Sequence, residues 1–231
     1  MEKLFCIPFA GGSHFYFECL KEKFNGILEV ELLDYAGHGS RFNENLLLNF
    51  EDMIKDIYNQ ILIRKKDPCD SICLFGYSMG ALIAYEIAKN YEDLNISLVI
   101  IAAFQPPNYL REYLHMDNKK ISWKIFNEKY TSSQFRNIKD ERFLNIYTRI
   151  LRNDFNCLYD YAMINVDFGK IKGNIVALCG IEDSLSVHFE DWGNFTTGSF
   201  KSYYFKGKHF FLGEHLNKIC SIIMDAVAIS I

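Results

Sequence analysis

The chain has 231 residues, of which 49% are hydrophobic and 23% charged, as in an ordinary globular domain with a large core. Its formal net charge of −4 argues against non-specific nucleic-acid binding, which needs a basic face to release counterions from phosphate. Its longest apolar run, over residues 96–104, is about half the ~20 residues of a membrane helix, and the N-terminus lacks a secretion-signal pattern. We therefore expect a cytoplasmic monomer with one domain over residues 1–231.

The strand-like and helix-like segments of the chain alternate. Short apolar runs that stop at turn residues predict buried strands over residues 4–9, 30–35, 71–78, 98–104, 174–180 and 200–205. Apolar residues at helical spacing predict helices over residues 50–63, 81–91 and 214–231. Because the strands are apolar throughout rather than alternating, we expect an α/β fold with a mainly parallel sheet covered on both faces.

The stretch from about residue 108 to 165 interrupts this rhythm. It contains no convincing strand and several helical patterns, including residues 141–155 and 157–164. We interpret it as a helical lid inserted over the carboxyl edge of the sheet. Its aromatic residues could line an acyl pocket, although such stripes more often serve core packing: Tyr113, Trp123, Phe126, Tyr130, Phe135, Phe143, Tyr147 and Phe155.

The most informative segment is Gly76-Tyr77-Ser78-Met79-Gly80, which fits G-x-S-x-G between a buried strand and a helix. This is the setting of a nucleophile elbow, in which a strained turn holds the serine hydroxyl clear of the sheet. The glycines would let strand and helix approach closely, and the helix start would direct N–H groups at a developing oxyanion. The alternative is an ordinary strand-to-helix turn with a capping serine.

A nucleophilic serine needs a base and a group that orients the base, and in this fold the chain order is serine, acid, histidine. Asp183 follows the strand over residues 174–180, and His209 lies between the last strand and the closing helix. Other histidines fit less well. His188 comes too soon after Asp183, His215 is expected inside the closing helix, and His14, His38 and His115 precede the acid.

The second amide of an oxyanion hole is expected in the loop after the first central strand, here residues 7–13. Backbone N–H groups near Ala10, together with that of Met79, are the candidates. An ordinary glycine turn at Gly11-Gly12 is an equally good interpretation of that loop.

Taken in order, these segments resemble the type II thioesterases that accompany polyketide and non-ribosomal peptide synthetases. The resemblance covers nearly the whole chain and rests on the following segments: IPFAGGSHFYF, LLDYAGHGSRF, FGYSMGALIAYEIA, ILRNDF, GIEDSLSV, Trp192 with Gly198 and Phe200, and FKGKHFFL. Two places in the sequence depart from the family pattern. Residues 35–39 read Tyr-Ala-Gly-His-Gly where the family favours Pro-Gly-Arg, although Arg41 is retained, and Lys208 replaces a common glycine.

The resemblance implies an α/β-hydrolase fold with Ser78, Asp183 and His209 as triad and Ala10 and Met79 as oxyanion amides. It also implies an acyl or aminoacyl substrate on the phosphopantetheine arm of a carrier protein, with no metal and no organic cofactor. The role would be to remove stalled or wrong acyl units. The alternatives are a general carboxylesterase or acyltransferase on the same scaffold, and a non-catalytic protein that docks carrier proteins.

Overall fold

In the computed structural model, residues 3–114, 119–120, 123–124, 126–127, 140–164, 168–184 and 187–230 are described. Six parallel strands form one sheet in the order β2-β1-β3-β4-β5-β6. The strands are β1 (Lys3–Ile7), β2 (Glu29–Leu32), β3 (Ile72–Tyr77), β4 (Ile96–Ala102), β5 (Asn174–Gly180) and β6 (Phe200–Phe205). Each predicted strand is therefore present. The bounds of β5 and β6 match the prediction, and those of the other four differ by one to three residues.

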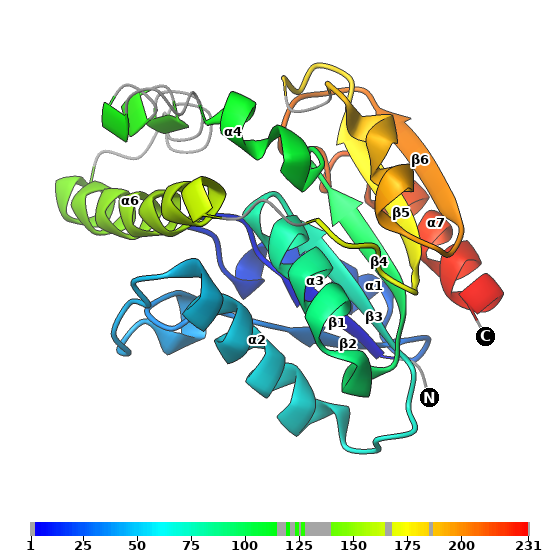
Figure 1. The fold of residues 1–231 in the computed structure, drawn as a ribbon. Helices are drawn as coiled ribbons and strands as arrows, with labels where there is room; N and C mark the ends of the chain where they lie inside the picture. Colours follow the sequence, from blue (N-terminus) through cyan, green and yellow to red (C-terminus); the bar gives the residue numbers. More distant parts are fainter. Residues whose placement is uncertain are drawn as a thin grey trace.

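The helices differ in length and in the face of the sheet that they cover. The α-helices are α1 (Glu18–Lys23), α2 (Phe50–Lys65), α3 (Met79–Asn90), α4 (Leu110–Tyr113), α6 (Glu141–Ile164) and α7 (Leu216–Ser230). Short 3-10 helices are η1 (His14–Phe17), η2 (Gly39–Arg41), η3 (Glu92–Leu94), η4 (Pro107–Tyr109) and η5 (Phe189–Phe195). Helices α2 and α3 lie on one face of the sheet, and α1 and α7 on the other (Figure 1).

The buried residues form one cluster on each face, as expected for a sheet sandwiched between two helical layers. Strand β3 shows how the sequence produces this. Its buried side chains alternate, so that Ile72 and Leu74 join the α2/α3 cluster while Cys73 and Phe75 join the α1/α7 cluster. A strand buried on both sides needs apolar residues throughout, which explains the continuous apolar runs of the sequence.

The predicted insertion between β4 and β5 contains α4 and α6, and parts of it lie outside the described residues. Helix α6 lies beyond the carboxyl ends of the central strands, on the same side as α4 (Figure 1). The two helical patterns predicted over residues 141–155 and 157–164 form one continuous helix. Asn156, which separates the two patterns, is only a moderately weak helix former and does not interrupt the helix.

Candidate active site

Ser78 occupies the turn between β3 and α3, and its backbone is strained. Its φ of 52° and ψ of −118° lie in a region that residues with a side chain rarely adopt. The Ser78 N–H donates to the Ala102 carbonyl oxygen on the neighbouring strand at 2.8 Å, which fixes the turn to the sheet. A strained serine directly before a helix is the geometry predicted for the elbow.

The flanking glycines make the close approach of strand and helix possible. A Cβ atom on Gly76 would overlap the backbone of Gly80 and Ala81 at the start of α3. A Cβ atom on Gly80 would overlap the carbonyl oxygens of Ile7 and Pro8 at the end of β1. Both positions therefore require glycine because backbone atoms fill the space that a side chain would take.

Three side chains that lie far apart in the sequence meet at this turn. The Ser78 Oγ lies 3.1 Å from Nε2 of His209, and Nδ1 of His209 lies 2.7 Å from Oδ2 of Asp183. His209 and Asp183 are each 6% exposed. A buried carboxylate at this distance favours a proton on Nδ1 and leaves Nε2 free to accept the serine proton. The structure thus brings together the three residues that the sequence suggested.

The loops that carry Asp183 and His209 contact each other at the end of β5. The Glu182 N–H donates to the Gly207 carbonyl oxygen at 2.9 Å. A Cβ atom on Gly180 would overlap the carbonyl oxygens of Gly207 and Lys208. Because Gly180 lacks a side chain, the two loops can approach closely enough for the carboxylate to reach the imidazole.

The two candidate oxyanion amides leave the same edge of the sheet. Strands β1 and β3 pair in parallel up to Ile7 and Gly76, so the loop carrying Ala10 and the turn carrying Met79 follow adjacent strand ends. Ala10 and Met79 are buried. Within the described part of the chain, neither backbone N–H has a hydrogen-bond acceptor. Unpartnered buried amides are rare, and two at one strand edge are suited to an oxyanion.

Tyr77 supports the histidine and was not singled out from the sequence. Its hydroxyl donates to the His209 carbonyl oxygen at 2.5 Å and accepts from the Phe211 N–H at 3.1 Å. The side chain is fully buried. Tyr77 therefore ties the strand before the elbow to the histidine loop, and links the position of His209 to that of Ser78.

Replacing Tyr77 with Phe is expected to reduce kcat about tenfold and to destabilise the fold by about 1–3 kcal/mol. The change leaves the buried His209 carbonyl oxygen and the Phe211 N–H without their hydrogen-bond partner, and it leaves the histidine loop less constrained. The matched control is Tyr204→Phe, because the Tyr204 hydroxyl donates to the exposed Glu190 side chain on the surface. Turnover and thermal unfolding of both variants would be measured. A Tyr77→Phe enzyme with wild-type kcat and wild-type stability would contradict the supporting role.

Four of the other histidines have partners away from Ser78, and His115 lies outside the described residues. His215 ends the turn just before α7 rather than lying inside the helix as predicted, because α7 begins at Leu216. The partners are Asp34 for His14, Asp154 for His38, the stacked Tyr109 ring for His188, and the Lys206 carbonyl oxygen for His215. His209 is the histidine that contacts Ser78 in the described part of the chain.

An apolar cavity of about 730 Å³ lies beside the loop that follows β1. Its walls are formed by that loop, by the loop around His38 and by the first half of α6. Of the aromatic residues predicted for the lid, Phe143 and Tyr147 line this cavity, whereas Phe155 is fully buried in the core. Trp123 and Phe126 pack near Phe155, and the positions of the Tyr113 side chain, Tyr130 and Phe135 lie outside the described structure.

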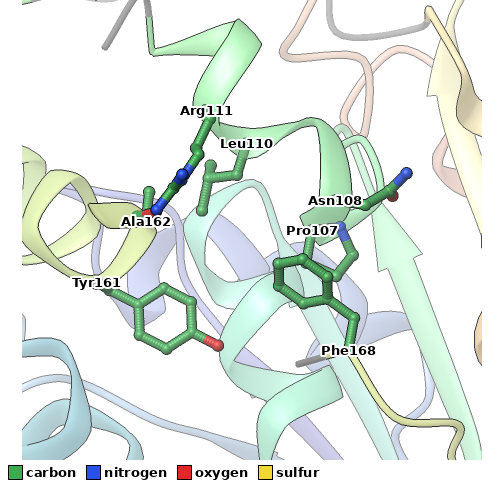
Figure 2. Close-up of a pocket in the computed structure, with 7 residues that line it drawn as sticks. All are labelled: Pro107, Asn108, Leu110, Arg111, Tyr161, Ala162 and Phe168. Atoms are coloured by element: carbon green, nitrogen blue, oxygen red, sulfur yellow. The ribbon is translucent and has the colours of Figure 1, made fainter. Parts of the chain in front are cut away.

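A smaller cavity of about 120 Å³ lies where the insertion joins the sheet (Figure 2). The Tyr161 and Phe168 rings face this space from opposite sides. Arg111 crosses above it and donates to the Ala162 and Met163 carbonyl oxygens, which caps the end of α6. Ser78, Asp183 and His209 are not among its described lining residues, so this cavity belongs to the base of the insertion.

Two features are absent from the described residues. No group of three or more His, Cys, Asp or Glu side chains in this part of the chain is arranged to hold a metal ion. None of the helices described is both long and apolar enough to cross a membrane.

The chain was compared with known proteins. A family model described as "Thioesterase domain" matches residues 2–227. A Streptomyces griseus protein named "Probable cadicidin biosynthesis thioesterase" is 28% identical over 97% of this chain, which spans 62% of that relative's length. Thioesterase PikA5 of Streptomyces venezuelae is 24% identical over 99% of this chain and 82% of its own length.

Structural comparison agrees with this result. The crystal structure of ClbQ from the colibactin NRPS/PKS pathway superposes with a TM-score of 0.83 at 22% identity, covering 99% of this chain and 98% of ClbQ. This likeness confirms the predicted α/β-hydrolase fold. Since the family model covers nearly the whole chain, the protein belongs to the thioesterase domain family.

Proposed function

We propose that the protein is a serine thioesterase that hydrolyses acyl or aminoacyl thioesters from the phosphopantetheine arm of carrier proteins. The observation that carries the proposal is the chain of contacts from Ser78 to His209 (3.1 Å) and from His209 to Asp183 (2.7 Å). Family membership supports the thioester bond as the target. The pathway names of the relatives support a carrier protein as partner and an editing role in a polyketide or non-ribosomal peptide pathway.

The proposed reaction has two halves. Ser78 Oγ attacks the thioester carbonyl carbon while His209 Nε2 accepts its proton and Asp183 holds the imidazole. The Ala10 and Met79 amides donate hydrogen bonds to the oxyanion that forms. The C–S bond then breaks, His209 returns the proton to the departing sulfur, and the acyl group remains on Ser78. Water then attacks the carbonyl carbon of this ester while His209 accepts a proton from the water. The bond from the carbonyl carbon to Ser78 Oγ breaks, His209 returns the proton to Oγ, and the free acid leaves.

The donors of the oxyanion hole contribute to both halves of the reaction, because a tetrahedral oxyanion forms in each. Loss of one such donor typically raises the barrier by about 2.7–4 kcal/mol. The apolar cavity supports a substrate with an apolar acyl group, because its walls are aromatic and aliphatic and because Phe9 and Gly11, on either side of Ala10, line it. The three residues of the triad are not among its described lining residues, so the support comes from its position next to the loop that carries the candidate oxyanion amide. No step of this mechanism requires a metal or an organic cofactor.

The test is to follow release of a short acyl group from a holo-carrier protein beside a matched p-nitrophenyl ester. Ser78→Ala is the control for both substrates. The proposal predicts free acid and free thiol in equal amounts, faster turnover of the thioester than of the ester, and loss of both activities in Ser78→Ala.

Each alternative predicts a different result. A general esterase would cleave the ester rapidly and leave the acylated carrier intact. An acyltransferase would release the thiol without an equal amount of free acid. A protein that only docks carriers would bind the carrier and turn over neither substrate.

A further inference from the structure

Asp154 joins the insertion to the loop that follows β1. It lies on α6, is 0% exposed, and its Oδ2 accepts the Gly11 N–H at 2.7 Å. The same oxygen lies 2.9 Å from Nε2 of His38, which is 2% exposed. Its Oδ1 has no hydrogen-bond partner among the described residues. A buried carboxylate is costly unless charge and hydrogen bonds compensate it, so these two contacts carry its stabilisation.

One face of α6 contacts the same glycine. A Cβ atom on Gly11 would lie 3.1 Å from a Tyr147 ring carbon and 3.2 Å from a Leu151 methyl carbon. Tyr147, Leu151 and Asp154 follow at i, i+4 and i+7, and so lie on one side of the helix. Gly11 has a φ of +72°, a conformation that glycine adopts without strain. The insertion thus holds Gly11 by packing and by a hydrogen bond.

In the loop after β1, the amides of Gly11 and Gly12 donate hydrogen bonds to described residues and the amide of Ala10 does not. Gly11 N–H is bound by Asp154, and Gly12 N–H donates to the Phe9 carbonyl oxygen at 2.8 Å. Pro8 has no N–H to donate. The amides of Gly11 and Gly12 are therefore engaged, whereas no acceptor is found for the Ala10 amide within the described part of the chain. A contact that fixes Gly11 therefore fixes the peptide next to the candidate oxyanion amide.

The surroundings of His38 indicate that both of its ring nitrogens carry protons. Nε2 faces the Asp154 carboxylate, and Nδ1 lies 3.1 Å from the Ala36 carbonyl oxygen. Both partners are acceptors, and only the imidazolium can donate to two acceptors at once. Burial lowers the pKa of His38, but the charge and hydrogen bond of Asp154 outweigh it, so that the pKa lies above its ordinary value of 6.5.

We infer that Asp154 is a positioning residue for catalysis, which sets the Ala10 amide through Gly11 and is itself held by His38. This inference rests on the proposed thioesterase function. It means that α6 is a fixed wall of the site rather than a free flap, because withdrawing α6 would remove the acceptor of the Gly11 amide. Neither His38 nor Asp154 touches the serine, so both act through the loop.

The first test is Asp154→Asn, with Asp160→Asn on the same helix as matched control. Asp160 is exposed and pairs with the half-buried Lys119, so its substitution should leave turnover unchanged. Asparagine keeps the shape of Asp154 but removes the charge that His38 and Gly11 bind. We expect kcat for thioester hydrolysis to fall about 10–100-fold with KM changed less than about threefold, because the oxyanion is bound only in the transition state.

A transition-state analogue separates positioning from a structural role. A trifluoromethyl ketone analogue of the substrate forms a tetrahedral adduct with the serine, and its oxyanion occupies the same amides. Its Ki should rise in Asp154→Asn by about the factor by which kcat/KM falls. Should Asp154→Asn fold poorly, His38→Gln, which keeps a donor but not the charge, is expected to change Ki in the same direction by a smaller factor.

The outcomes distinguish the inference from the proposed function. Wild-type protein that hydrolyses no carrier-bound thioester contradicts the proposed function and removes the basis of the inference. Active wild type combined with unchanged kcat and Ki in both variants overturns the positioning role alone. A loss of folded protein in proportion to activity, with unchanged Ki in the folded fraction, also overturns it and leaves a purely structural pair.

The charge of His38 also predicts how stability depends on pH. The pKa of His38 is higher in the folded protein than in the unfolded chain. Its contribution to the free energy of unfolding is therefore complete below about pH 6.5 and is lost as the pH rises through the folded pKa. The neighbouring ionisable groups are Asp154 and Tyr147 on α6, and Asp34, Tyr35 and the Asp34-bound His14 on the β1 and β2 loops. Burial raises the pKa values of both tyrosines, which therefore stay neutral.

Thermal unfolding of wild type and His38→Gln from pH 5.5 to 9 measures this contribution. We expect the Tm of the wild type to exceed that of the variant by the largest amount at pH 5.5. This difference in Tm should decrease as the pH rises. A gap that stays constant or widens with rising pH would contradict the charged state assigned to His38.

Discussion

Ser78→Ala is expected to lower kcat/KM for a carrier-bound thioester by about 10⁴–10⁶-fold, because removal of the nucleophile leaves only binding and oxyanion stabilisation. The fold should be unaffected. Alanine keeps the Cβ atom, so the strain at φ 52° is the same in both proteins, and the Ser78 N–H still donates to Ala102. Thiol release under single-turnover conditions and thermal unfolding give the two quantities.

The matched control for this prediction is Ser202→Ala. Ser202 lies on the edge strand β6, and its hydroxyl bonds the exposed Glu190 carboxylate. It should retain wild-type turnover. A Ser78→Ala protein that is folded and retains more than about 1% of wild-type activity would show that the reaction uses another nucleophile.

Gly80→Ala is expected to have the largest effect on stability, about 3 kcal/mol or more, or to prevent folding. The added methyl group would overlap the Ile7 and Pro8 carbonyl oxygens, which belong to the backbone of the central strand β1 and its following loop. Neither can move without displacing α3 from the sheet. Met79 precedes Gly80 at the start of α3, and Ala10 lies in the loop after β1. Any variant that still folds should also lose activity, because the overlap displaces these two candidate oxyanion amides relative to each other.

Gly213→Ala provides the matched control. No atom lies within 4 Å of a Cβ built on Gly213, so the same substitution is expected to change stability by less than about 0.5 kcal/mol. Urea unfolding of both variants gives the comparison. Equal free energies of unfolding for Gly80→Ala and wild type would mean that the start of α3 packs less closely on β1 than described.

The strands and the three site residues could be predicted because their signals are local. Buried parallel strands need unbroken apolar runs, and the elbow needs glycine at Gly76 and Gly80 for steric reasons that hold whatever the rest of the chain does. Asp183 and His209 follow strands whose ends meet at one sheet edge. Chain order then assigns acid and base without knowledge of distances.

The supporting residues could not be predicted because their partners lie far away in the sequence. His38 and Asp154 are 116 positions apart, and nothing in either segment indicates that both become buried. Tyr77 occupies a variable position of the motif, yet the partners of its hydroxyl follow the last strand. The helical pattern predicts that the closing helix begins at residue 214, two residues before α7 does, because Glu214 and His215 continue the pattern while their backbone forms a turn.

The pair of His38 and Asp154 also gives a physical meaning to a departure from the family pattern. The sequence has histidine at the position where the resemblance favours arginine, and this histidine is buried against the carboxylate that holds the loop after β1. A histidine makes the charge of this contact dependent on pH, whereas an arginine stays charged across the physiological range.

The central claim is that Ser78 is a nucleophile activated by His209, and covalent labelling tests it most directly. The protein would be incubated with a fluorophosphonate, and intact mass and peptide mapping would locate the adduct. We predict a single adduct on Ser78 that forms at least about 100-fold more slowly in His209→Ala and is blocked by prior incubation with the trifluoromethyl ketone. An adduct on another residue, or labelling of Ser78 at the same rate in His209→Ala, would contradict the account.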